Sequence, residues 1–201
     1  RVPSTNEWEI GVAERMFSNL YGIGGLGKGF KKYITVNNCI SFEIVGLPGE
    51  IRFYVYTPKR FVDLVEKQIL GAYQDADISV VEEYNIFAKD CKVAYTSLEL
   101  TDAEYYPLKM AEDFKGDPLG NILSVVSKMG ENEGMLIQVV VAPAGSDWQK
   151  RGSKFVRSVE ANNADPEKKK MKVSQEKLQA ISKKTSKIGF HTSIRIVASA
   201  P

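Results

Sequence analysis

Apolar side chains recur at two different spacings along the chain, and these spacings predict its helices and strands. A spacing of about four residues predicts helices at 9–22, 58–73, 117–130 and 146–162, with a Lys-rich helical linker at 165–187. Alternation of apolar and polar residues predicts strands at 38–46, 50–58, 77–84, 91–100, 133–143 and 190–200. The sequence GLPGE at 46–50 supplies the Pro and Gly of a tight turn, so the first two strands are predicted to form a hairpin.

The order of these elements predicts an α+β fold with a mainly antiparallel sheet and its helices on one side. Strands and helices follow each other similarly in both halves, which predicts two ferredoxin-like units. We expect an N-terminal helix and Gly-rich connector at 1–32 and a first α+β unit at 33–90. A second α+β unit is expected at 91–201, with a Lys-rich insertion at 163–187.

The composition is that of an ordinary globular protein, because 43% of the residues are hydrophobic. A net charge of +2 neither favours nor excludes a nucleic-acid partner, since a local patch matters more than the sum. No apolar run is long enough for a membrane-spanning helix. Cys39 and Cys91 lie far apart without a C-x-x-C motif, and we expect reduced thiols in a cytoplasmic protein. The first residue is Arg1 and not Met, which indicates a piece of a longer polypeptide.

The segment GIGGLGKG, from Gly22 to Gly29, fits both the G-x-G-x-x-G and the G-x-x-x-x-G-K nucleotide-binding patterns. Both patterns need a strand before the loop and a helix after it, so that the helix N-terminus can hold the phosphates. Here the predicted helix precedes the loop and a strand follows, and Gly29 replaces the Ser or Thr that would ligate magnesium. We therefore predict a mobile connector that exposes Lys28, Lys31 and Lys32, with contact to a phosphate-bearing partner as the alternative.

The candidate catalytic side chains do not form a constellation. His191 is the only histidine, which excludes Ser-His-Asp triads and multi-histidine zinc sites. Pairs of carboxylates such as Asp75 and Asp77 fall at predicted turns, where solvated side chains are expected. We predict no catalytic residue, no metal site and no cofactor, and thus a chain that is not an enzyme.

Lysines concentrate in the predicted helical linker near the C-terminus. The candidate partner-contacting residues there are Lys168, Lys169, Lys170, Lys172, Lys177, Lys183, Lys184 and Lys187. Leu178, Ile181, Thr185 and Ile188 lie at helical spacing between them, so one side can pack while the lysines face water. One interpretation is a solvated helix face. The other is contact with DNA phosphates or with an anionic membrane surface.

Five segments of the chain, taken in order, carry a resemblance to a known bacterial domain. They are RVPSTNEWEIGVAERMFSNLYGI, ISFEIVGLPGEIRFYVYTPKRFVDLVEKQILGAYQDADISVVEEY, DPLGNILSVVSKMGENEGMLIQVVVAP, DWQKRGSKFV and KIGFHTSIRIVAS. Their characteristic residues are Glu14, Met16, Phe17, Glu66, Lys67, Gln68, Ile69, Gln138, Trp148, Ile194, Arg195 and Ile196. In order and spacing these segments resemble the domain that precedes the P-loop motor in conjugation and type IV secretion-like ATPases of uncultured small-genome bacteria.

The resemblance implies a non-catalytic accessory domain that mediates oligomerisation or docking to a membrane channel, with ATP hydrolysis in a downstream motor. The implied partners are the motor domain of the same polypeptide, further copies of the chain and membrane-channel subunits. The implied location is the cytoplasm, at the inner face of the membrane through the full-length protein. The Gly-rich loop and the Lys-rich insertion depart from the family pattern, so the resemblance implies no role for them. The alternative function, based on the lysines at 168–187 and on the context of a motor, is a nucleic-acid-binding module that uses the Lys-rich segment.

Overall fold

A computed structural model describes residues 10–26, 38–110, 113–117, 119–167 and 171–201. Its helices are α1 (Ile10–Leu20), α2 (Val62–Ala72), α3 (Gly120–Val126), α4 (Asp147–Ala164) and α5 (Gln175–Thr185). Its strands are β1 (Ile40–Leu47), β2 (Glu50–Tyr56), β3 (Lys92–Leu98), β4 (Gly134–Pro143) and β5 (Phe190–Ala200). Short 3-10 helices occupy Tyr21–Leu26 and Lys59–Phe61. The predicted α+β class is confirmed.

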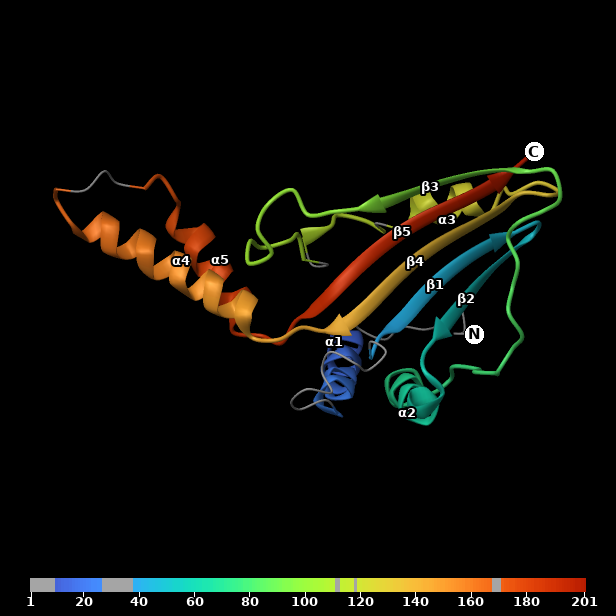
Figure 1. Cartoon of the computed structure of the whole chain (residues 1–201), viewed down its shortest axis with the longest axis horizontal. Helices are drawn as coiled ribbons and strands as arrows, with labels where there is room; N and C mark the ends of the chain where they lie inside the picture. Colours follow the sequence, from blue (N-terminus) through green and yellow to red (C-terminus); the bar gives the residue numbers. More distant parts are fainter. Residues whose placement is uncertain (1–9, 27–37, 111–112, 118, 168–170) are drawn as a thin grey trace. The chain divides into compact units, whose positions relative to one another are not determined.

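The five strands form one open sheet in the order β2-β1-β4-β5-β3, and every neighbouring pair is antiparallel (Figure 1). The predicted hairpin is confirmed, with Leu47 opposite Glu50 and Gly49 at a φ of +76° in the turn between them. Strands from both predicted units, 33–90 and 91–201, belong to this one sheet. The finer assignment to two ferredoxin-like units stays a prediction.

The chain divides into two compact units that are not successive in the sequence. The sheet unit comprises residues 1–99, 115–143 and 190–201, and the helical unit comprises residues 100–114 and 144–189. In the described part of the chain, no helix is both long enough and apolar enough to cross a lipid bilayer.

Helices α1 and α2 cover one face of the sheet. Met16 and Leu20 of α1 and Val65 of α2 pack with Ile40 of β1 and Val141 of β4, which lie opposite each other in the ladder. Along β1, Ile40 and Phe42 lie on the helix side while Ser41 and Glu43 lie on the other side, as the period of two predicts. The burial of this apolar cluster is the main source of stability for the sheet unit.

The opposite face of the sheet holds a buried carboxylate. Glu43 on β1 is only 7% exposed. Its carboxylate accepts hydrogen bonds from the hydroxyl groups of Ser41 and Tyr84, both at 2.7 Å, and from the side-chain amide of Gln138 at 2.8 Å. The Tyr84 ring also stacks on Tyr54 of β2, with ring centroids 4.7 Å apart. Three donors therefore compensate for the loss of water around Glu43.

The strand predicted at 77–84 is wrong, because these residues have no regular secondary structure. Val80 is 94% exposed, so the alternating pattern did not reflect a buried face. Two other side chains attach this segment to the sheet: Tyr84 bonds to Glu43, and Ile86 is buried. The backbone of Ile86 lies where a side chain at Gly134 would project, which explains the glycine at the start of β4.

The helical unit is a pair of helices, α4 and α5, that packs through a small apolar cluster (Figure 1). Val156 and Val159 of α4 meet Leu178 and Ile181 of α5. Gly152 allows the close approach, because an added Cβ would lie 2.5 Å from the Thr185 methyl group. The helix predicted at 146–162 is confirmed by α4. Of the Lys-rich linker predicted to be helical at 165–187, Gln175–Thr185 is helical as α5, whereas residues 165–167 and 171–174 are not.

Tyr84→Phe is expected to lower the free energy of unfolding by about 1–2 kcal/mol, because the buried Glu43 carboxylate loses one of its donors. Burial and the bond to Glu43 both raise the pKa of Tyr84, so the hydroxyl keeps its proton across the physiological range. Urea denaturation measures the effect. The matched control is Tyr56→Phe on β2, which is exposed and should change stability by less than about 0.5 kcal/mol. Equal effects of the two substitutions would contradict the role given to Tyr84.

Candidate functional site

Charge is distributed unevenly between two parts of the chain. Residues 144–189, called the basic hairpin from here on, hold 12 of the 27 Lys and Arg residues but only 5 of the 25 Asp and Glu residues. The basic hairpin thus has a formal charge of +7, while the rest of the chain, with 15 basic and 20 acidic residues, has −5. The small net charge of the whole chain conceals this separation, and the basic hairpin is a candidate surface for an anionic partner.

The lysines predicted to meet a partner fall into three groups. Lys28, Lys31, Lys32, Lys168, Lys169 and Lys170 lie outside the described residues. Lys177 and Lys184 make specific contacts with residues 100–114 of the helical unit. Lys172, Lys183 and Lys187 are exposed. Of the five lysines that the structure describes, two are therefore engaged within the helical unit and three are exposed.

Lys184 holds the two segments of the helical unit together. Its amine donates hydrogen bonds to the backbone carbonyl oxygens of Glu104 and Tyr106, both at 2.7 Å. Burial lowers the pKa of Lys184, and the nearby Glu104 carboxylate partly opposes this effect. An amine in this position satisfies two carbonyl groups and has little capacity left for an outside ligand.

Two more cations of the basic hairpin contact the same loop. Arg151 Nε donates to Glu104 Oε1 at 2.6 Å, and the two side chains form an ion pair. A backbone hydrogen bond within Glu104, followed by the bond from Arg151, lowers the pKa of the Glu104 carboxyl. The Lys177 amine lies 4.4 Å from the centre of the Tyr106 ring, within cation–π distance. These contacts are structural, so Arg151 and Lys177 join Lys184 in holding the loop.

The structure adds three cations that the sequence interpretation overlooked. Lys150, Lys154 and Arg157 lie on α4 at spacings of four and three residues, which places them on one side of the helix. All three are exposed. Lys150 pairs with Asp147 at 3.2 Å, whereas Lys154 and Arg157 form no ion pair with any described residue. Their helical spacing is the signal in the sequence that could have identified them, although lysines are denser after residue 167.

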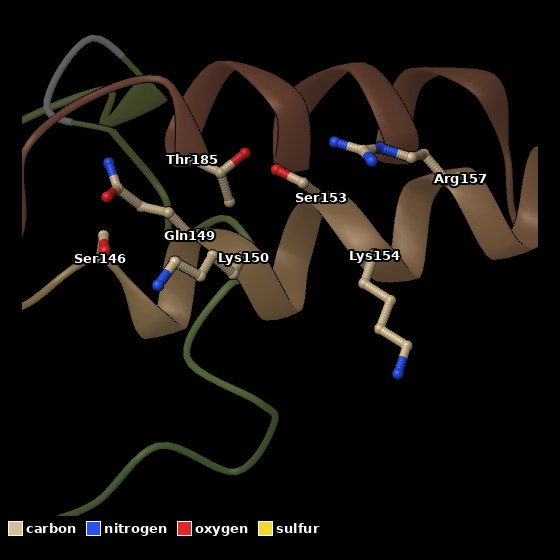
Figure 2. Close-up of a pocket in the computed structure, with 7 residues that line it drawn as sticks. All are labelled: Ser146, Gln149, Lys150, Ser153, Lys154, Arg157 and Thr185. Atoms are coloured by element: carbon tan, nitrogen blue, oxygen red, sulfur yellow. The ribbon is translucent and has the colours of Figure 1, made fainter.

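A groove of about 500 Å³ runs along this side of α4. Figure 2 shows its lining, which comes from α4 and from Thr185 of α5: Ser146, Gln149, Lys150, Ser153, Lys154, Arg157 and Thr185. Gln149 and Ser153 are half-buried, and the Gln149 amide donates to the Lys187 carbonyl oxygen at 2.7 Å. The groove thus combines cations at its rim with uncharged polar groups, an arrangement suited to holding an anion.

Other candidate chemistry has less support from the geometry. Among the described residues, no group of three His, Cys, Asp or Glu side chains is placed to hold a metal ion. His191 lies exposed on β5, as expected for a surface histidine. Gly22 and Gly24 lie in the 3-10 helix that follows α1, so the loop begins after a helix as predicted, and β1 is the next strand that the structure describes. Gly27 and Gly29 lie outside the described residues.

Lys184→Met is expected to destabilise the helical unit by about 1–3 kcal/mol, because two carbonyl groups lose a charged donor. Hydrogen exchange of residues 104–106 should become faster, which reports on the loop directly. Lys183→Met is the matched control: it removes the same charge from the adjacent, exposed position and should leave the exchange unchanged. A loop that exchanges equally fast in both variants would contradict the structural role of Lys184.

Comparison with known proteins identifies the family of the chain. No curated protein and no solved structure matches the chain. One family matches residues 11–201, which is nearly the entire chain. The chain therefore belongs to the family described as "Domain of unknown function (DUF8128)".

Proposed function

We propose that this chain is a non-catalytic accessory domain of a DNA- or protein-translocating ATPase of the type IV secretion kind, and that it mediates oligomerisation or docking to a membrane channel. The proposal starts from the five segments that resemble such domains. Four of them fall mainly on elements of the sheet unit: α1, the β1–β2 hairpin with α2, α3 with β4, and β5. The sheet unit is thus the part of the chain to which the proposal assigns assembly.

The observation that carries the proposal is the exposed apolar character of both edge strands. Phe53 on β2 is 67% exposed and Tyr95 on β3 is 85% exposed. Further large apolar side chains on these two strands are exposed: Val55, Tyr56, Val93 and Leu98. Proteins usually protect an open edge with charges, prolines or a covering element, and β3 contains Lys92 as its only charged residue. Edges of this kind favour pairing with another protein surface.

In the full-length polypeptide, Tyr95→Lys combined with Leu98→Lys is expected to weaken assembly by at least about tenfold, because two charges would have to be desolvated at the edge. Sedimentation velocity measures oligomerisation, and co-fractionation with membranes measures docking. Both side chains are more than half exposed, so the stability of the fold should change by less than about 0.5 kcal/mol.

Gln175→Lys combined with Gln179→Lys on α5 is the matched control, because it adds the same two charges at exposed positions outside the sheet. The control should assemble like the unmodified protein. If the edge variant also assembles and docks normally, the edge strands do not mediate assembly and the proposal fails.

A second function of a different class is a nucleic-acid-binding module, and the charge of the basic hairpin favours it. A surplus of seven positive charges over residues 144–189 supports contact with a polyanion whatever the net charge of the chain. This function predicts salt-sensitive binding that does not depend on a second copy of the chain. The two functions use different units of the molecule and are compatible with each other.

A further inference from the structure

We infer that Lys150, Lys154 and Arg157 of α4, together with the groove beside them, bind the phosphodiester backbone of a nucleic acid. The inference rests on the second proposed function and narrows it to one side of one helix. It also shifts the site away from the Lys-rich segment at 163–187, where the density of lysines is highest.

The three cations are spread along α4 and do not converge on a single position. Residues 150 and 157 are separated by about 10 Å along the helix axis, at a rise of about 1.5 Å per residue. A single small anion would occupy only part of such a row. A chain of regularly repeated negative charges matches it, because each long side chain can reach a different phosphate.

Availability distinguishes these cations from those that hold the loop, and their position beside the groove distinguishes them from the exposed lysines of the hairpin beyond α4. Arg151, Lys177 and Lys184 are committed to the loop at 100–114. Lys154 and Arg157 form no ion pair within the described part of the chain. The ion pair between Lys150 and Asp147 is exposed on both sides and therefore weak, so a phosphate can replace the carboxylate.

The groove supplies the uncharged donors that a phosphate site uses. Ser146 and Ser153 contribute hydroxyl groups to the lining of the groove, which they share with the three cations (Figure 2). Hydroxyl groups and guanidinium groups are common partners of backbone phosphates, and Arg157 can donate two hydrogen bonds to one phosphate. Contacts of this type fix the position of the backbone without reading its sequence.

The packing of the hairpin favours a nucleic acid over a membrane surface. A helix that inserts at a membrane interface must expose its apolar face to the lipid. The apolar face of α4 is instead covered, because Val156 and Val159 are buried against Leu178 and Ile181 of α5. Base stacking is not supported either, since the aromatic rings of Tyr105, Tyr106 and Phe155 pack against one another.

The test measures binding of the full 201-residue chain to a fluorescent DNA duplex by anisotropy over a range of salt concentrations. The α4 variant combines Lys150→Gln, Lys154→Gln and Arg157→Gln. It should lose at least about tenfold in affinity, and the slope of log K against log salt should decrease by about 2–3 because up to three phosphate contacts are removed. Two duplexes of unrelated sequence should bind alike.

The matched variant combines Lys172→Gln, Lys183→Gln and Lys187→Gln, which removes the same charge from exposed positions beyond α4. It should keep the salt slope of the unmodified chain. Circular dichroism verifies that both triple variants are folded. Lys154→Gln alone, expected to reduce the slope by about 1, replaces the triple variant if the latter fails to fold.

The outcomes separate the inference from the function on which it rests. If the slope of log K against log salt decreases as much in the matched variant as in the α4 variant, or more, the inference is overturned. Nucleic-acid binding by the basic hairpin would still stand. If the unmodified chain does not bind the duplex even at low salt, both the inference and the second proposed function fall. Binding to vesicles that contain anionic lipid, without binding to the duplex, would overturn the inference in favour of a membrane surface.

Discussion

The antiparallel ladder between β4 and β5 is the interaction on which both the centre of the sheet and the closure of the insertion at 144–189 depend. Its ten residue pairs extend from Gly134 opposite Ser199 to Pro143 opposite Phe190, so the chain leaves the sheet and returns to it at directly opposed residues. Two such strands need only a short turn, yet here residues 144–189 stand in its place. A hydrogen bond of 2.9 Å from the Ala144 amide to the Gly189 carbonyl oxygen closes the base of this insertion. Because the ladder already holds its ends together, a long insertion costs little additional closure entropy.

This connection explains how one chain can carry two surfaces with different physical properties. The sheet unit obtains its stability from an apolar core under α1 and α2 and from the donors around Glu43, and neither depends on the charges of the basic hairpin. The hairpin has its own apolar cluster between α4 and α5. Each unit can therefore change its exposed side chains without loss of the other's core. A surplus of positive charge can collect on the hairpin while the rest of the chain is acidic.

Most elements of the fold could be predicted from the sequence because their apolar periodicity is local. The pattern failed at 77–84, since a strand also needs a hydrogen-bonding partner, and the partner is a property of the whole sheet. The burial of Glu43 could not be predicted from the sequence either, because its donors Tyr84 and Gln138 lie 41 and 95 residues away in the chain. Part of the candidate site could be predicted from the sequence, since the spacing of Lys150, Lys154 and Arg157 places them on one side of a helix. The sequence could not predict that Lys154 lacks an ionic partner among the described residues, because this depends on the tertiary structure.

The adjacent residues Lys183 and Lys184 show why counting lysines overestimates the charge that is available to a partner. Successive side chains on a helix point about 100° apart, so these two amines face different surroundings. Lys184 faces the loop, has lost part of its water and donates to two carbonyl groups. Lys183 remains exposed, and it keeps its hydration and its rotamer freedom. Lys177 lies seven residues before Lys184, on the same side of α5, and its amine lies over the Tyr106 ring. Helical phase, and not lysine density, therefore decides which cations of the basic hairpin stabilise its fold and which are available for binding.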